Sequence, residues 1–191
     1  MELDKFRDYI YDLHDNKCNQ KYADTLPYST HLGFVEVQGE KFIHLIPNSI
    51  LVNEKNCQSY PVHYRDIVRY ALIAHDSIED ARMTYNNVLE SVNTEEFGNY
   101  PAAVMVADIV YAVTDEKGKT RKERKNNKYY DELKKNDLAL FVKLSDLAAN
   151  TLFSKLSGSS MYNKYKKEWP KFKEALYLFK YDSFFEYIEN I

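Results

Sequence analysis

A histidine and an aspartate close an almost entirely apolar segment of the chain. The segment VHYRDIVRYALIAHD (62–76) ends in His75 and Asp76. A further carboxylate, Asp146, lies inside the apolar run LFVKLSDLAAN, and His31 follows the segment LPYST. Burying such groups without partners is costly, whereas a divalent cation offsets the charge of buried carboxylates. These residue types and positions therefore predict a metal site.

The spacing leaves open which histidine joins the His-Asp pair. His31 is one candidate, and His44 or His63 could take its place. A purely structural explanation is open as well, since Asp146 in the middle of a helix could simply pair with Lys143. A lone His-Asp dipeptide is common, so the prediction rests on the conjunction of these polar groups in apolar segments.

Two more acids follow the His-Asp pair at helical spacing. Glu79 comes four residues after His75 and Asp80 four after Asp76, so both return to the same neighbourhood if the helix continues. Carboxylates beside a metal can orient a water molecule and accept its proton. We therefore expect Glu79 and Asp80 to be the catalytic residues of a metal-dependent hydrolase.

A cation and an amide share a helix face with the third carboxylate. Lys143, Asp146 and Asn150 stand at i, i+3 and i+7, which places them on one side of a helix. An ammonium group suits a phosphate, and an amide suits a sugar or a base. This face therefore predicts a nucleotide-like substrate next to the metal.

The elements that would hold these residues follow from the apolar pattern. Only five glycines and five prolines interrupt 191 residues, which favours long helices over many short strands. The spacing is helical in five segments, which are residues 3–15, 62–76, 102–113, 137–155 and 161–189. Asp137 is the expected N-cap of its helix. We expect loops at 16–30 and 114–128, and either a helix or irregular chain at 32–60, all within one all-α domain.

Charge and cysteine content argue against several classes of function. A net charge of −3 gives no general attraction to nucleic acid or to an anionic membrane. The two cysteines have no CxxC spacing, and no apolar run reaches the roughly 18 residues of a membrane span. The start, MELDKFRDYI, lacks the apolar core of a signal peptide. We therefore expect a cytoplasmic protein with a small-molecule partner, and nothing in the sequence specifies its oligomeric state.

Four segments carry motifs of a known family. LPYSTH (26–31) is similar to a PY-x-x-H motif, and ALIAHDSIEDARMT (71–84) is similar to AALLHD-x-x-ED. VKLSDLAANT (142–151) matches K-L-A-D-x-x-x-N, and VTDEKGKTRKERK (113–125) looks like the loop that follows a V-T-D/K element. Over residues 21–156 the chain thus resembles the HD-domain phosphohydrolases, and among them the hydrolase domain of the RelA/SpoT family and its small stand-alone relatives.

This resemblance implies a single HD-domain helical bundle that spans residues 1–191 and removes the 3′-pyrophosphate of ppGpp-type alarmones. The products would be GDP or GTP and pyrophosphate. The metal, usually Mn²⁺ in this family, would be held by His31, His75, Asp76 and Asp146. Glu79 and Asp80 would position and activate the attacking water. The substrate-binding residues implied by the resemblance are Lys21, Arg121, Lys143 and Asn150.

The chain also departs from the family pattern. Leu32 and Leu147 stand where the family has a proline and an arginine, and residues 32–60 contain an insertion relative to compact relatives. Base recognition can therefore differ, and either Tyr28 or Tyr162 is expected to border the base. The rival functions are another HD phosphohydrolase, such as an NADPH phosphatase or a 5′-nucleotidase, and a non-catalytic HD-fold nucleotide-binding or antitoxin protein.

Overall fold

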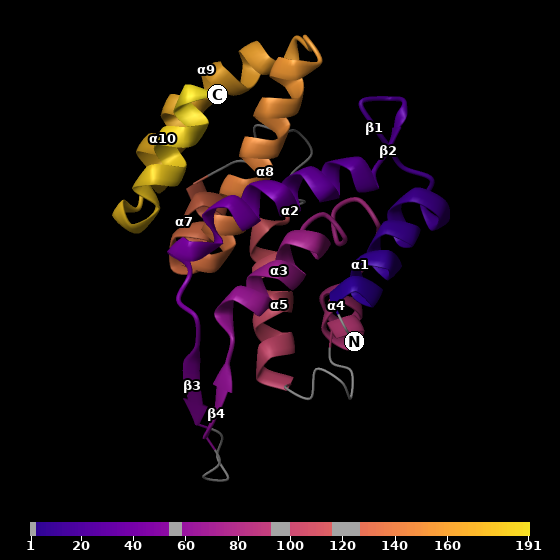
Figure 1. The fold of residues 1–191 in the computed structure, drawn as a ribbon, viewed down its shortest axis with the longest axis vertical. Helices are drawn as coiled ribbons and strands as arrows, with labels where there is room; N and C mark the ends of the chain where they lie inside the picture. Colours follow the sequence, from indigo (N-terminus) through magenta and orange to yellow (C-terminus); the bar gives the residue numbers. More distant parts are fainter. Residues whose placement is uncertain (1–2, 54–58, 93–99, 116–126) are drawn as a thin grey trace.

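The apolar segments of the sequence fold into helices that lie around one hydrophobic core (Figure 1). The computed structural model describes residues 3–53, 59–92, 100–115 and 127–191. Within these residues the helices are, in chain order, α1 (Leu3–Asp12), α2 (Ser29–Phe42), α3 (Tyr64–Ala74), α4 (Tyr85–Val92), α5 (Tyr100–Val113), α7 (Asn127–Lys135), α8 (Asp137–Leu156), α9 (Met161–Leu176) and α10 (Asp182–Asn190).

Helix α8 is the central element of the bundle. It packs against α2, α3, α5, α7, α9 and α10, and most of its residues are buried. The Asn136 side chain caps it by accepting a hydrogen bond from the Ala139 amide at 3.1 Å. The expectation that Asp137 is the N-cap is therefore wrong by one residue, because Asn136 has the extended backbone of a cap and Asp137 begins the helix.

The other two buried helices are also confirmed. Helix α3 begins at Tyr64 and its last residue is Ala74, so the predicted His-Asp pair follows the helix directly. Helix α5 includes Pro101 in its first turn, where a missing amide hydrogen costs no helical hydrogen bond. Both helices pack against α8 and against each other, which brings the end of α3 to the middle of the bundle.

Two short hairpins accompany the helices. Strands β1 (Lys21–Tyr22) and β2 (Leu26–Pro27) pair antiparallel within the predicted loop 16–30, across a turn in which Ala23 and Asp24 have φ of 49° and 66°. Strands β3 (Ile50–Asn53) and β4 (Ser59–Val62) pair antiparallel and project from the helices (Figure 1). The region 32–60, whose structure the sequence left open, thus holds most of α2, the 3-10 turn η2 (Ile43–Leu45), strand β3 and the start of β4.

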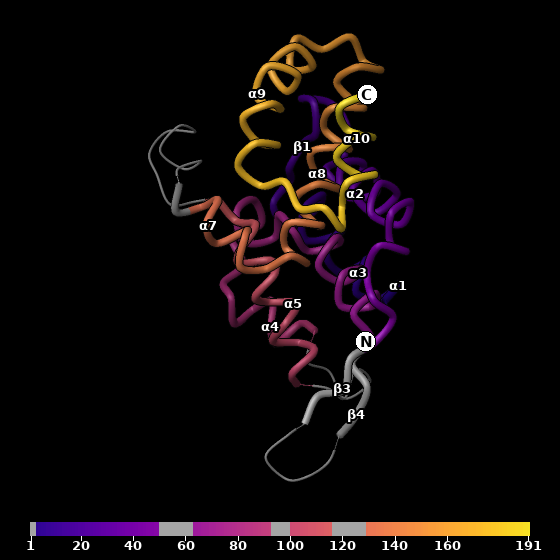
Figure 2. The backbone as a smooth tube through the Cα atoms, turned by 90° about the vertical axis from the view of Figure 1, so that its left-hand side faces the viewer, coloured from indigo at the N-terminus to yellow at the C-terminus, as the bar shows by residue number. Residues whose placement is uncertain are grey.

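The ends of the chain differ from simple helices. Helix α1 continues as a π-helical turn, η1 (Leu13–Lys17). The predicted segment 161–189 divides into α9, the short 3-10 turn η3 (Phe179–Tyr181) and α10, and α9 and α10 pack together at the end of the bundle away from α4 and α5 (Figure 2).

The all-α fold class is confirmed, since helices make up nearly all of the regular structure in the described ranges. The helices pack as one bundle around the core that α8 crosses. Among the described helices, none combines the length and the apolar character that crossing a membrane would require.

Candidate metal centre

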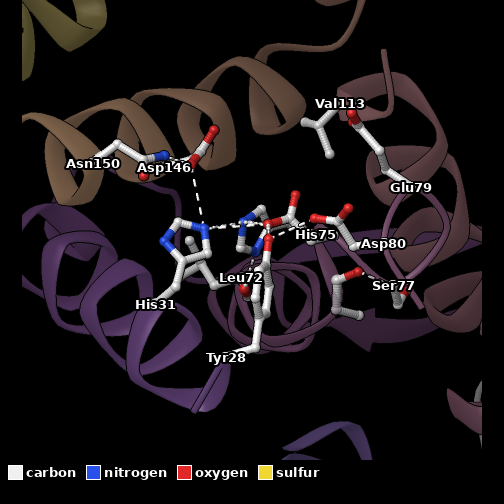
Figure 3. A network of polar contacts seen from close by, with 12 residues as sticks. Tyr28, His31, Leu72, His75, Ser77, Glu79, Asp80, Val113, Asp146 and Asn150 are labelled. Carbon is white, nitrogen blue, oxygen red and sulfur yellow. Dashed lines mark hydrogen bonds and ion pairs between the residues drawn. The ribbon is translucent and has the colours of Figure 1, made fainter. Parts of the chain in front are cut away.

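Four side chains from three parts of the bundle face one point. His31 lies in the first turn of α2, His75 directly follows α3, and Asp146 lies in the middle of α8 (Figure 3). Asp76 is the residue after His75. The His31 Nε2 atom is 3.3 Å from His75 Nε2, 3.2 Å from Asp76 Oδ2 and 3.5 Å from Asp146 Oδ1. His75 Nε2 is 3.0 Å from Asp76 Oδ2. The Nε2 atoms of both histidines and an oxygen of Asp76 therefore surround a common centre, and an Asp146 oxygen lies next to the His31 member of this group.

The backbone of α3 orients the His75 ring. Its Nδ1 lies 2.9 Å from the Leu72 carbonyl oxygen, which is an acceptor, so Nδ1 carries the hydrogen and Nε2 is directed to the centre. Burial lowers the pKa of His75, but the charge and hydrogen bond of Asp76 outweigh it and raise the pKa to about 9. The positive charge of a protonated His75 thus offsets the negative charge of the Asp76 carboxylate. A metal cation bound at the same place would offset that charge in the same way.

The Asp146 carboxylate is held from both sides by its own helix. Lys143 Nζ donates to Oδ2 at 2.8 Å, and Asn150 Nδ2 donates to Oδ1 at 2.5 Å. Burial alone would raise the pKa of Asp146, but the positive charges of Lys143 and His75 outweigh it and lower the pKa. The predicted common face of Lys143, Asp146 and Asn150 is confirmed, and the ion pair with Lys143 that the sequence left open is present.

The Tyr28 hydroxyl connects Asp76 to Asp80. It lies 2.7 Å from Asp76 Oδ2 and 2.6 Å from Asp80 Oδ2. Helix α3 ends at Ala74, but the two aspartates still have the i, i+4 spacing of a helical turn. The Asp80 amide donates a hydrogen bond to the Asp76 carbonyl at 2.8 Å. Burial and the charge of Asp76 raise the pKa of Asp80 above the usual value, although the Tyr28 hydrogen bond opposes this. Asp80 therefore stands beside the centre in an environment that favours proton uptake.

His14 and Gln20 support this arrangement from behind. The buried His14 ring stacks on the Tyr28 ring at 4.9 Å with an interplanar angle of 6°. Its Nδ1 lies 2.5 Å from Gln20 Oε1, and Gln20 Nε2 donates to the Asp80 carbonyl at 2.8 Å. No local pattern in the sequence predicts this group, because its contacts join His14 to Tyr28, 14 positions away, and Gln20 to Asp80, 60 positions away.

Glu79 lies apart from Asp80, with its side chain beside Val113 at the end of α5 (Figure 3). The Asp115 amide donates to Glu79 Oε2 at 3.3 Å. Burial, together with a hydrogen bond and the charge of the Asp115 carboxyl group, raises the pKa of Glu79 to about 8. Asp115 was not predicted as a site residue, although it is the aspartate of the V-T-D motif at 113–115 that supports the family resemblance.

A cavity of about 250 Å³ borders the centre. Three of the ligand candidates, His31, Asp76 and Asp146, line it. The predicted catalytic and substrate-binding residues in its wall are Glu79, Asp80, Lys143 and Asn150. Three tyrosines, Tyr22, Tyr28 and Tyr165, form an aromatic part of its wall. The Tyr22 hydroxyl donates to Asn150 Oδ1 at 3.1 Å, so the β1–β2 hairpin is tied to α8 at this cavity.

Other predicted residues lie elsewhere. Lys21 is exposed on β1 and does not line the cavity. Arg121 lies outside the described residues. His44 and His63 are exposed, so of the three candidate histidines His31 is the one beside the His-Asp pair. The Tyr162 hydroxyl donates to the Ile191 carbonyl at 3.3 Å, and Tyr165 takes the place at the cavity that was expected of Tyr162.

The chemistry of the donor set fits a divalent cation. Ligand atoms of His31, His75 and Asp76 lie within 4.8 Å of one another, and both histidines are almost fully buried, with 2% and 3% of their surface exposed. Imidazole and carboxylate ligands suit manganese, iron and zinc, and the Leu72 carbonyl that accepts from His75 is a kind of partner that metal-bound histidines commonly have.

Neither a scan against protein-family models nor a search of curated proteins finds a match to this chain.

Proposed function

We propose that this protein is a metal-dependent phosphohydrolase that removes the 3′-pyrophosphate of ppGpp-type alarmones and releases GDP or GTP and pyrophosphate. The observation that carries the proposal is a group of two histidines and two aspartates that borders a cavity whose wall includes two further acids, Glu79 and Asp80. A buried group of this kind has little structural purpose, because apolar side chains of similar size would stabilise the bundle as well.

His31, His75, Asp76 and Asp146 are the residues that would hold the cation, and the resemblance to HD-domain enzymes favours Mn²⁺. A divalent cation supplies Lewis-acid polarisation of a phosphoryl oxygen and makes water more acidic. The chain contributes the geometry, since Leu72 fixes the His75 ring and Lys143 with Asn150 fixes the Asp146 carboxylate.

Asp80 is the proposed general base. One of its carboxylate oxygens is occupied by the Tyr28 hydroxyl, which leaves the other to accept a proton from water in the cavity. The raised pKa of Asp80 makes it a stronger base than an exposed aspartate. Glu79 is the second acid of the pair and lies at the same cavity.

The cavity suits the reacting part of a nucleotide. Its volume of about 250 Å³ is smaller than a typical ligand pocket, so it would take the phosphate groups and the ribose while the base lies towards the rim. Lys143 offers a buried positive charge to the phosphates, and Asn150 and the tyrosines offer polar and aromatic contacts. We also propose Lys21 and Arg121 as residues that contact the phosphates, as the resemblance implies.

Product analysis over a panel of substrates tests the proposal. Purified protein with Mn²⁺ is incubated with ppGpp, its adenosine counterpart, NADPH and simple nucleotides, and the products are resolved by anion exchange. We expect pyrophosphate from ppGpp, and a loss of about 10²–10⁴-fold in rate for Asp80→Asn, the usual contribution of a general base.

Other outcomes would redirect the assignment. Orthophosphate from NADPH or from simple monophosphates, without pyrophosphate from ppGpp, would favour a phosphatase or nucleotidase. Binding of a nucleotide with no product from any substrate, at full metal loading, would favour a non-catalytic nucleotide-binding protein.

A further inference from the structure

The side chain of Tyr22 contacts both of the helices that carry His31 and Asp146. Tyr22 is the second residue of β1, and its ring packs on the His31 ring of α2, with a centroid distance of 4.9 Å and an interplanar angle of 30°. The same ring packs on Phe153 of α8, at 4.6 Å and 51°. Its hydroxyl donates to Asn150 Oδ1, also on α8, at 3.1 Å. The β1–β2 hairpin therefore touches both helices at the candidate metal centre through one residue.

The Asn150 amide is oriented by the groups at its two ends. The Asp146 carboxylate, which is paired with Lys143, offers only acceptors, so the amide must turn its Nδ2 towards Asp146 Oδ1, at 2.5 Å. The amide oxygen then points to the Tyr22 hydroxyl, which supplies a hydrogen. The hydroxyl, the amide and the carboxylate thus form a row in which each group donates to the next. Without the hydroxyl, the amide oxygen loses the donor that fixes this orientation.

The Asp146 oxygen at the end of this row faces the other ligand candidates. Asp146 Oδ1 accepts from Asn150, and it is also the oxygen that lies 3.5 Å from His31 Nε2 (Figure 3). Lys143 holds the other oxygen, Oδ2, at 2.8 Å. The Asn150 amide therefore sets the position of the carboxylate oxygen that a cation next to His31 would meet.

We propose that Tyr22 is a positioning residue for the metal ion, because its hydroxyl fixes the Asn150 amide and this amide holds Asp146 Oδ1 towards the cation. The inference rests on the metal site of the proposed function and is independent of the substrate. Partners that hydrogen bond to metal ligands typically contribute about 10–100-fold to metal affinity. Tyr22 acts through one intermediate side chain, so its hydroxyl should contribute at the lower end of this range.

A double-mutant cycle on Mn²⁺ affinity tests the inference without turnover. Electron paramagnetic resonance of free Mn²⁺ gives the dissociation constant for the full chain, Tyr22→Phe, Asn150→Ala and the double variant. Tyr22→Phe keeps the ring and removes only the hydroxyl, and it should raise the dissociation constant about tenfold. Asn150→Ala should raise it at least as much. Adding Tyr22→Phe to Asn150→Ala should then have no further effect, because the hydroxyl acts through the amide.

Tyr11→Phe is the matched control. It removes a tyrosine hydroxyl that donates to Glu36 Oε1 of α2 at 2.6 Å, away from the ligand candidates, and should leave the dissociation constant unchanged. Urea unfolding verifies that each variant is folded.

Three outcomes would overturn the inference. Unchanged Mn²⁺ affinity in Tyr22→Phe, while His75→Ala abolishes binding, overturns the role of Tyr22 and leaves the metal centre in place. Equal losses from Tyr22→Phe with and without the Asn150 side chain overturn the path through the amide. A parent protein that binds no Mn²⁺ overturns the metal centre and the role of Tyr22 together.

Discussion

Gly39 of α2 packs directly against Leu72 of α3. A Cβ atom built on Gly39 would lie 2.3 Å from Leu72 Cδ1 and 2.9 Å from Cδ2, so only a glycine allows this approach. The two helices carry the metal-ligand candidates His31 and His75, and the Leu72 carbonyl accepts the hydrogen bond of His75 Nδ1. The spacing of α2 and α3, and with it the distance between the two histidines, therefore depends on a glycine about two helical turns along α2 from His31.

Gly39→Ala should destabilise the protein. The added methyl group would force Leu72, which is almost fully buried, out of its position, and overpacking of this kind costs about 1–3 kcal/mol against a gain of up to about 1 kcal/mol in helix propensity. Gly33→Ala is the matched control on α2, since its Cβ meets only the Tyr11 hydroxyl at 3.3 Å. Urea unfolding should show a loss for Gly39→Ala and none for Gly33→Ala. Equal stability of both variants would contradict the close packing of α2 and α3.

Loading with Mn²⁺ should raise the melting temperature. A ligand that binds only the folded chain stabilises it by about 2.7 kcal/mol at a hundredfold excess over its dissociation constant, which for a chain of this length is roughly 5–10 °C. His75→Ala should abolish this increase because it removes a central ligand. His63→Ala, an exposed histidine at the start of α3, should retain it. A thermal shift that persists in His75→Ala would place the metal elsewhere.

The sequence predicted the bundle because its buried helices are almost continuously apolar. Segments 62–76, 102–113 and 137–155 became α3, α5 and α8 with shifts of only a few residues at their ends. The two hairpins were missed for a physical reason. The sequence between the strands of each hairpin contains no Asn-Gly or Asp-Gly pair. The first hairpin also turns through Ala23, whose left-handed backbone is uncommon outside glycine, asparagine and aspartate.

The candidate site was predicted in part. His75, Asp76 and Asp146 stood out because they are polar residues inside apolar runs, and the structure brings them together with His31. Its supporting residues gave no such signal. His14 stacks on Tyr28, and Asp115 meets Glu79, through contacts between distant parts of the chain that follow no local pattern.

Tyr28→Phe should slow hydrolysis while metal binding persists. The change removes the hydroxyl that contacts both Asp80 Oδ2 and Asp76 Oδ2, but it leaves the ring that stacks on His14 and all four ligand candidates. Losing a hydrogen bond to a charged group costs roughly 1.5–3 kcal/mol, so the rate should fall at least about tenfold. Tyr85→Phe, whose hydroxyl bonds to Asp108 on the surface, is the control. Rates that are equal in the two variants would show that Tyr28 does not position Asp80.

Glu79→Gln should reduce the loss of stability at alkaline pH. The pKa of Glu79 is raised to about 8, above the roughly 4.3 of an unfolded glutamate, so its contribution is fully present below about pH 4 and is lost as the pH rises through 8. Glutamine stays neutral, so between pH 5 and pH 9 the variant should lose less stability than the parent protein. Urea unfolding of the metal-free proteins measures this. The control is Glu90→Gln, at an exposed position of α4, which should follow the parent.

Anomalous diffraction at the manganese edge tests the central claim most directly. Crystals of the protein soaked in Mn²⁺ should show one strong peak bonded to His31 Nε2, His75 Nε2, Asp76 and Asp146, at about 2.0–2.3 Å. The Asp80 and Glu79 carboxyl groups should lie beside it without direct bonds. A peak at other residues, or no peak at a Mn²⁺ concentration that saturates known manganese enzymes, would contradict the account.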